Sequence, residues 1–132
     1  MSTHHGILVH VIFSTKYRAP VLDESWRDEL FAYIGGTVKD HKTVLLEAGG
    51  IEDHIHLLIK LHPQFAISST LQLLKANSSR WINEHHKTPS RFQWQRGYGA
   101  FSVSQSMVST VKQYIAKQRE HHRTQNFKQE FL

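Results

Sequence analysis

Cysteine is absent from this chain of 132 residues, which excludes disulfide bonds and metal sites built on thiolates. No apolar run is long enough to cross a bilayer, so we expect no membrane contact. The first residues lack the basic start and long apolar segment of a secretory signal, so the cytoplasm is the expected compartment. No repeat, low-complexity tract or linker interrupts the sequence. These absences predict a single domain over residues 1–132, large enough for its own core.

What the chain has instead is a modest excess of positive charge and many histidines. The formal charge is +5 with the histidines neutral, and there are 11 histidines. A positive excess suits a polyanionic partner such as nucleic acid, although many soluble proteins share it. Because histidine is abundant, two of them can stand close together by chance. Any histidine motif therefore has to be weighed together with its surroundings.

The first quarter of the chain predicts a strand followed by a helix. Residues 7–13 are apolar except for His10 and read as a buried strand. Asp23 is typical of a helix N-cap. The apolar stripe that such a helix would bury consists of Trp26, Leu30, Tyr33 or Ile34, and Val38.

A hairpin is predicted next, and it carries the most informative motif. Residues 44–46 and 51–59 read as two strands, and Gly49-Gly50 between them favours a tight turn because glycine tolerates positive φ. Side chains alternate faces along a strand, so His54 and His56 share one face, about 6.5–7 Å apart at the backbone. Two imidazoles at that spacing can hold one metal ion. A chance pair is the alternative interpretation.

The same alternation places Leu58 on the face of the two histidines. The opposite face takes Ile55, Leu57 and Ile59.

The second half predicts a helix, a strand and a last helix. A capping-box pattern at residues 69–72 opens a helix that would expose Lys75, Ser79 and Arg80. Its expected buried residues are Leu71, Leu74, Trp81 and Ile82. A strand region follows over residues 92–103. A second capping-box pattern at residues 102–105 opens a helix through about His122, and a polar tail starts at about residue 123.

This order of elements predicts an α+β fold. It is the split β-α-β arrangement of a ferredoxin-like or RRM-like antiparallel sheet, with one extra C-terminal helix. The helices would cover one face of the sheet and leave the other free to bind something. The first and third strands would be central, which places His10 near the histidine pair. The favoured interpretation of His10 is a core histidine with a satisfied hydrogen bond.

The last helix carries a second candidate group. Val108, Val111 and Ile115 would form its buried stripe, and Tyr114 and Gln118, one turn apart, project from the same side. Taken alone, this helix fits a core tyrosine with a solvated hydroxyl and a solvated glutamine better than it fits an active site.

Together these motifs resemble the single-tyrosine HUH transposases of small bacterial insertion sequences, which move single-stranded DNA. His54-Ile55-His56 matches the two histidines around a bulky apolar residue, and Tyr114 with Gln118 matches Tyr-x-x-x-Gln on a downstream helix. Further matches are Thr15-Lys16-Tyr17-Arg18, Asp53, and Trp94-Gln95-Arg96-Gly97-Tyr98-Gly99-Ala100-Phe101-Ser102. The resemblance covers nearly the whole chain in the right order.

The resemblance implies a mechanism and its site residues. Tyr114 would attack a DNA phosphodiester, forming a 5′-phosphotyrosine and freeing a 3′-hydroxyl that later rejoins DNA. His54, His56 and Gln118 would hold a divalent metal, Mg²⁺ or Mn²⁺, ions that suit a site with open positions for phosphate and water. The residues do not identify the base for Tyr114, and His121 and His122 equally fit a solvated helix end. The family also implies a hairpin near the element ends as the DNA ligand, and a homodimer whose sites are assembled in trans.

Basic and aromatic side chains are the candidates for DNA contacts. Cations position a strand through its phosphates, and exposed aromatic rings stack on unpaired bases. The basic candidates are Lys16, Arg18, Lys75, Arg80, Arg91, Arg96, Lys112 and Lys117, and the aromatic ones are Tyr17, Trp94 and Tyr98. For each aromatic residue, plain core packing is an equally good interpretation.

Two rival functions are considered. A catalytically silent or domesticated module that binds single-stranded nucleic acid would use the same fold, but the intact motif residues argue against it. A histidine-triad nucleotide hydrolase needs a third histidine where Leu58 stands.

Overall fold

A computed structural model describes residues 6–118, and it contains a four-stranded antiparallel sheet with three helices. The last helix is described to residue 118, so the expected helix end at His122 and the tail from residue 123 lie outside the described residues. The elements in chain order are β1 (Ile7–Ser14), η1 (Lys16–Arg18), α1 (Glu24–Val38), η2 (Lys39–His41), β2 (Val44–Ile51), β3 (His54–Leu61), α2 (Ile67–Glu84), β4 (Gly99–Ser102), η3 (Gln105–Met107) and α3 (Val108–Lys117).

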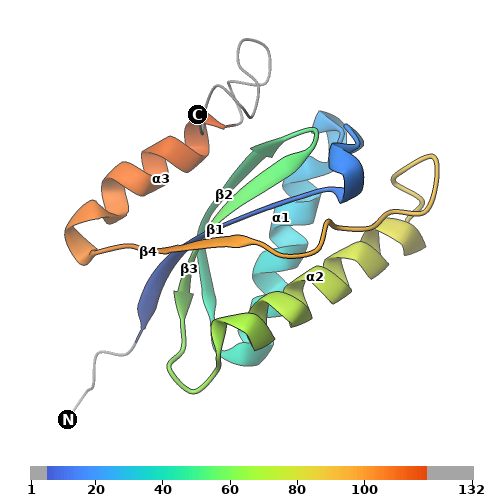
Figure 1. Cartoon of the computed structure of the whole chain (residues 1–132). Helices are drawn as coiled ribbons and strands as arrows, with labels where there is room; N and C mark the ends of the chain where they lie inside the picture. The colour runs from blue at the N-terminus through green and yellow to red at the C-terminus, as the bar shows by residue number, and fades with distance from the viewer. Residues whose placement is uncertain (1–5, 119–132) are drawn as a thin grey trace.

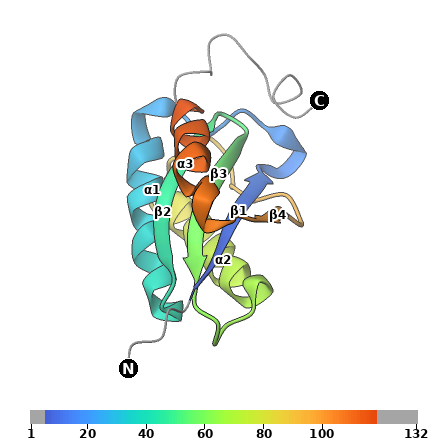
Figure 2. The same ribbon diagram turned by 90° about the vertical axis from the view of Figure 1, so that its left-hand side faces the viewer.

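The sheet has the order β2-β3-β1-β4, with all neighbours antiparallel. This is the order expected of the split β-α-β arrangement, and β1 and β3 are central as predicted. Helices α1 and α2 cover one face of the sheet, whereas α3 lies across the other (Figure 1). The expectation of a free second face is therefore wrong in part, because α3 contacts β2 and β3 on that side (Figure 2).

Alternation along β3 sorts its side chains as the sequence predicts. Ile55, Leu57 and Ile59 belong to the hydrophobic core shared with α1 and α2. His54 and His56 are also fully buried but are not part of that core. A single strand thus supplies both the centre of the core and the centre of the candidate site.

Two helix predictions are confirmed in their main points. The side chain of Asp23 accepts a hydrogen bond of 3.0 Å from the backbone N–H of Ser25, which is the expected N-cap. The buried positions of α1 include Ile34, while Tyr33 stays partly exposed. The predicted residues that are buried in α1 and α2 are Trp26, Leu30, Ile34, Val38, Leu71, Leu74 and Ile82, and Trp81 is partly buried.

The turn prediction at Gly49-Gly50 is wrong. Both glycines lie inside β2, paired with His56 and Ile55, and the turn is formed by the next two residues, Glu52 and Asp53. Neither glycine has a positive φ. A Cβ at Gly49 would instead overlap the carbonyl oxygen of Ile115 in α3. This glycine therefore marks a close approach of two backbones rather than a turn.

Both capping-box predictions are wrong as well. Helix α2 begins three residues early, with Ala66 instead of Ser69 at the N-cap and no side-chain cap, so the 69–72 pattern falls within the helix. The 102–105 pattern ends at Gln105, the first residue of the short η3 turn, and α3 begins only at Val108. Tertiary packing, and not the local pattern, determines where these helices begin.

The predicted strand over residues 92–103 is much shorter than expected. Only Gly99–Ser102 forms β4, and Trp94 makes an isolated bridge to Thr15. Phe92 and Trp94 are buried, and the indole N–H of Trp94 donates to Ser78 Oγ at 2.9 Å. These contacts attach the segment to α2 and prevent it from continuing as a regular edge strand. Within residues 6–118, no helix combines the length and apolar character needed to cross a membrane.

Candidate active site

The two histidines of β3 meet under α3. His54 and His56 have no exposed surface, and their ring centroids are 5.1 Å apart with the planes inclined at 67°. The two rings therefore lie close together on one face of β3, as the alternation of side chains predicts. Burial is compatible with either a core pair or a ligand pair, so the partners of each ring decide what it can do.

Each histidine uses its Nδ1 atom to contact the protein. Nδ1 of His54 lies 2.9 Å from Oδ1 of Asp53, and Nδ1 of His56 lies 3.1 Å from Nε2 of His10. The predicted proximity of His10 and its hydrogen bond are thus confirmed. With Nδ1 engaged in this way, Nε2 is the ring nitrogen through which each histidine would bind a metal.

The environment keeps His56 neutral. Burial, with smaller contributions from His54 and His10, lowers the pKa of His56 to about 2. Burial also lowers the pKa of His10. A neutral imidazole is the form that binds a metal ion.

Tyr114 lies beside this cluster. Its ring centroid is 5.6 Å from that of His56 and 6.0 Å from that of His10, and both contacts are edge-on. Ile115 next to it is fully buried and anchors α3 on the backbone of Gly49. The tyrosine therefore lies against the histidines of its own chain.

Gln118 ends the same helix and is only 1% exposed. Its Nε2 donates to the carbonyl oxygen of Tyr114 at 3.2 Å. Its Oε1 is buried and has no hydrogen-bond partner among residues 6–118. A buried acceptor without a donor suits a cation, because an unsatisfied polar atom is otherwise costly.

These donors fit a divalent metal. Two imidazole nitrogens and one amide oxygen leave coordination positions for phosphate and water. Over residues 6–118, no group of three or more His, Cys, Asp or Glu side chains is arranged to hold a metal. Among residues 6–118, Gln118 is the candidate for a third protein ligand, because its Oε1 is buried without a hydrogen-bond partner there.

Asp53 is the residue whose role the sequence did not define. Its Oδ2 lies 3.0 Å from Nη2 of Arg18, while its Oδ1 contacts His54. Burial raises the pKa of Asp53, but the hydrogen bond to His54 and the charge of Arg18 outweigh this and lower it overall. The available signal was the position of Asp53, immediately before the first histidine.

The basic candidates for DNA contact are distributed over several surfaces. Arg18 is paired with Asp53, and Lys75 donates to the carbonyl oxygens of Gln95 and Gly97 at 2.7 and 2.9 Å. These two hydrogen bonds tie the segment before β4 to α2, and burial lowers the pKa of Lys75. Arg80 lies on the exposed side of α2, and Lys112 and Lys117 lie on the exposed side of α3.

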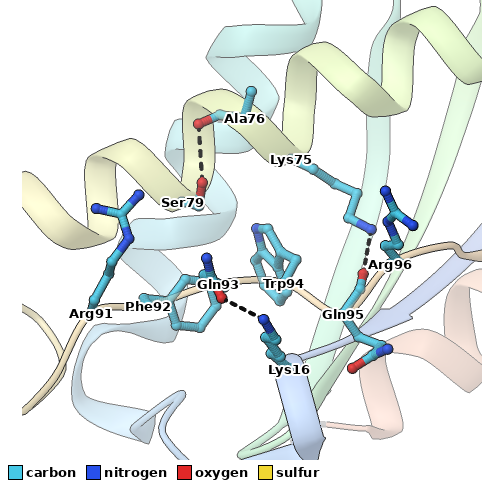
Figure 3. Close-up of a pocket in the computed structure, with 10 residues that line it drawn as sticks. All are labelled: Lys16, Lys75, Ala76, Ser79, Arg91, Phe92, Gln93, Trp94, Gln95 and Arg96. Atoms are coloured by element: carbon cyan, nitrogen blue, oxygen red, sulfur yellow. Dashed lines mark hydrogen bonds between the residues drawn. The ribbon is translucent and has the colours of Figure 1, made fainter.

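One groove gathers several of the remaining candidates. An open groove of about 510 Å³ lies between α2 and the segment before β4 (Figure 3). Lys16, Arg91 and Arg96 line it, and Nζ of Lys16 contacts Oε1 of Gln93 at 3.0 Å. Tyr17 stands nearby on η1 and is 84% exposed. A groove with cations and an exposed aromatic ring suits a nucleic-acid strand.

A sequence profile of the family described as "Transposase IS200 like" matches residues 3–118. The chain belongs to the IS200-like transposase family. The resemblance to single-tyrosine HUH transposases is thereby confirmed, and transposition of a mobile DNA element is the activity of the family. The matched residues include the histidine pair, Tyr114 and Gln118.

Individual relatives agree with this assignment. The transposase for insertion sequence element IS200 of Salmonella typhimurium is 28% identical over 116 residues, which are 84% of this chain and 76% of the relative. The ISDra2 transposase TnpA of Deinococcus radiodurans is 26% identical over 116 residues, covering 84% and 83% of the two chains.

Two solved structures share the fold. A protein described as a transposase from Deinococcus radiodurans R1 has a TM-score of 0.69 and 27% identity, covering 89% of this chain and 95% of the other. A REP-associated tyrosine transposase bound to a REP hairpin has a TM-score of 0.68 and 15% identity, covering 92% and 74%. The α+β fold predicted from the sequence is therefore confirmed.

Proposed function

We propose that this IS200-like transposase cuts and rejoins single-stranded DNA at element ends through a 5′-phosphotyrosine on Tyr114. The observation that carries the proposal is the edge-on contact of Tyr114 with His56, which brings this candidate nucleophile to the histidine pair. Its hydroxyl oxygen attacks the phosphorus, the bond to the 3′ oxygen breaks, and that oxygen leaves as a hydroxyl after taking up a proton. A 3′-hydroxyl later attacks the phosphotyrosine, releases Tyr114 and rejoins the DNA.

The neighbouring residues supply positioning and a place for charge neutralisation. His54, His56 and Gln118 would hold Mg²⁺ or Mn²⁺, which neutralises charge on the phosphate oxygens. Retaining the phosphoester bond on tyrosine lets the DNA be resealed without a nucleotide cofactor. Because free tyrosine has a pKa of roughly 10, removal of its proton needs help from the site.

A covalent-adduct assay tests this proposal. Tyr114→Phe should abolish the protein–DNA adduct on a gel while the fold is retained, because only one hydroxyl is lost. Tyr33→Phe is the matched control, since Tyr33 stacks on Trp81 on the opposite side of the molecule. The adduct should require Mg²⁺ or Mn²⁺ and disappear in EDTA. Gln118→Ala should weaken it less than His56→Ala, since water can fill one ligand position.

The contrary outcomes are clear. An undiminished adduct with Tyr114→Phe would remove Tyr114 from the mechanism, and full activity in excess chelator would remove the metal. A wild-type chain that binds DNA but never forms an adduct would instead support the catalytically silent binding module.

The proposed substrate is a single strand with a hairpin near the element ends. The groove beside Lys16, Arg91 and Arg96 supports it, since an open cationic groove tracks a flexible strand better than a duplex. Binding to a strand with a short hairpin should exceed binding to the matched duplex and should weaken with salt. Equal affinity for the blunt duplex at the same ionic strength would contradict this.

We further propose a homodimer with sites assembled in trans. Phe101 on β4 and Met107 before α3 are 57% and 46% exposed, so apolar surface stays open where a second copy would exchange its helix. Within a single chain, α3 contacts its own sheet. The proposal requires the same helix to make these contacts on the partner.

A mixed dimer separates the two arrangements. His56→Ala and Tyr114→Phe chains with different tags are co-expressed and purified as a heterodimer. In a trans arrangement, one composite site combines intact histidines with an intact Tyr114, and adduct formation returns. An inactive heterodimer, with both homodimers folded, would place each site within one subunit.

A further inference from the structure

We propose that Asp53 and His10 are positioning residues that select the tautomer and ring orientation of His54 and His56, and that Arg18 holds Asp53 in place. This inference deepens the proposed function, because it concerns how the two histidines present Nε2 to a divalent metal. It rests on two hydrogen bonds that reach the two Nδ1 atoms from different strands and turns.

The Asp53 contact fixes one histidine by chemistry alone. A carboxylate only accepts hydrogen bonds, so the Nδ1 atom of His54, at 2.9 Å, carries the hydrogen. The lone pair then lies on Nε2. His54 has no exposed surface, so water does not compete for this role at equilibrium. The second carboxylate oxygen is occupied by Arg18 at 3.0 Å, which sets the angle of the carboxylate plane.

The His10 contact selects the tautomer of its partner histidine less strictly than the Asp53 contact does. Its Nε2 lies 3.1 Å from Nδ1 of His56, and either nitrogen can be the donor. Metal binding through Nε2 of His56 requires Nδ1–H to donate and His10 to accept. His10 therefore permits the required tautomer, whereas Asp53 enforces it. The stacked rings of His10 and His56, with centroids 5.3 Å apart, also restrict rotation.

The backbone conformation at Arg18 indicates that contacts with the rest of the fold hold this residue in place. Tyr17 and Arg18 have φ values of 59° and 55°, in the left-handed region that non-glycine residues rarely occupy. Such strain persists only when the surroundings hold it. Here the backbone N–H of Thr15 donates to the carbonyl oxygen of Asp53 at 3.0 Å, which joins the strained turn to the turn carrying the carboxylate.

Metal affinity and tautomer are the two readouts. Mn²⁺ binding is measured by calorimetry or electron paramagnetic resonance, and the tautomers by long-range ¹H–¹⁵N spectra of the metal-free protein. Asp53→Ala should weaken Mn²⁺ binding by about 10–100-fold and release His54 from the Nδ1–H form. Asp53→Asn keeps an acceptor oxygen and should lose less.

Variants of the two supporting residues refine the test. His10→Gln keeps an acceptor and should retain more Mn²⁺ affinity than His10→Phe. Arg18→Met should give a smaller loss than Asp53→Ala. Asp40→Asn, an exposed carboxylate on η2, is the control and should change neither readout.

The outcomes distinguish this inference from the proposed function. If the wild type does not bind Mn²⁺ through the histidines, the metal part of the proposed function fails, and the tautomer spectra still decide the inference. If folded Asp53→Ala leaves the His54 tautomer unchanged, Asp53 is not a positioning residue and the inference is overturned.

Discussion

From His54 to Ile59 both faces of β3 are buried, but they differ in what they contribute to the protein. Leu57 faces α1 and α2, helices of 15 and 18 residues, and belongs to an apolar core. His56, one residue earlier, faces the 10-residue α3 and belongs to a polar cluster. Burying a leucine stabilises the fold, whereas burying an imidazole costs stability and is repaid only through its partners. Burial therefore does not tell the core from the site, but the chemistry of what is buried does.

The largest expected effect comes from truncating one residue on each face and comparing the loss of stability with the loss of activity. Leu57→Ala should lower the free energy of unfolding by about 2–5 kcal/mol, because it leaves a cavity in the core. His56→Ala should abolish adduct formation while costing less stability. Chemical denaturation and the adduct assay on both variants measure this. A His56→Ala chain that keeps its activity, or loses more stability than Leu57→Ala, would break the distinction between the faces.

The polar face should also make stability depend on pH. His56 has a pKa of about 2 when folded and about 6.5 when unfolded. Between these values the unfolded state binds a proton that the folded state does not, so stability rises with pH by up to about 1.4 kcal/mol per unit. The free energy of unfolding should therefore fall as the pH drops from 6.5 to 5.

A variant isolates this contribution. Thermal or denaturant unfolding in EDTA from pH 7 to 5 should show a smaller slope for His56→Gln than for the wild type. The window lies above the range in which Asp53, whose folded pKa is lowered, loses its own contribution. Identical slopes for the two proteins would mean that His56 is not held neutral by the fold.

Much of this comparison was predictable from the sequence, since period-two alternation assigns each residue of β3 to a face. The order of elements also predicts the sheet and its central strands, which brought His10 to the histidine pair. What failed were short local patterns. The capping boxes at residues 69–72 and 102–105 compete with packing of the whole helix, which determines where α2 and α3 begin.

The sequence proposes the candidate site as a set of residues but not as a network. The resemblance to single-tyrosine HUH transposases singles out the histidines, Tyr114 and Gln118 as candidates, and in the fold α3 brings Tyr114 to His56. The partners of Nδ1 were not assigned, because a hydrogen bond from β1 or from Arg18 depends on register and on a strained turn that no local pattern encodes. For the same reason Lys75 looks like a free cation in the sequence, whereas it supports a loop in the fold.

Gly49 shows most clearly why a local pattern can mislead, and it provides a further test. Gly49 shares the face of His56, its partner in the ladder, so a side chain there would point at α3. The atom in its way is the carbonyl oxygen of Ile115, which belongs to a backbone and does not rotate aside. Gly49→Ala should therefore displace α3, with a cost of about 1–3 kcal/mol from overpacking and a reduced adduct yield.

Gly36→Ala is the matched control on the other side of the molecule. Gly36 is exposed in α1, has no positive φ, and a Cβ there would meet nothing within 4 Å. Alanine should raise the free energy of unfolding by about 0.4–1 kcal/mol, because it restricts the unfolded chain, and should leave adduct formation unchanged. Denaturation curves and adduct yields of both variants decide the matter. If Gly49→Ala behaves like Gly36→Ala, the close approach of α3 to β2 is not what holds Tyr114 beside the histidines, and the helix must be positioned by its side chains alone.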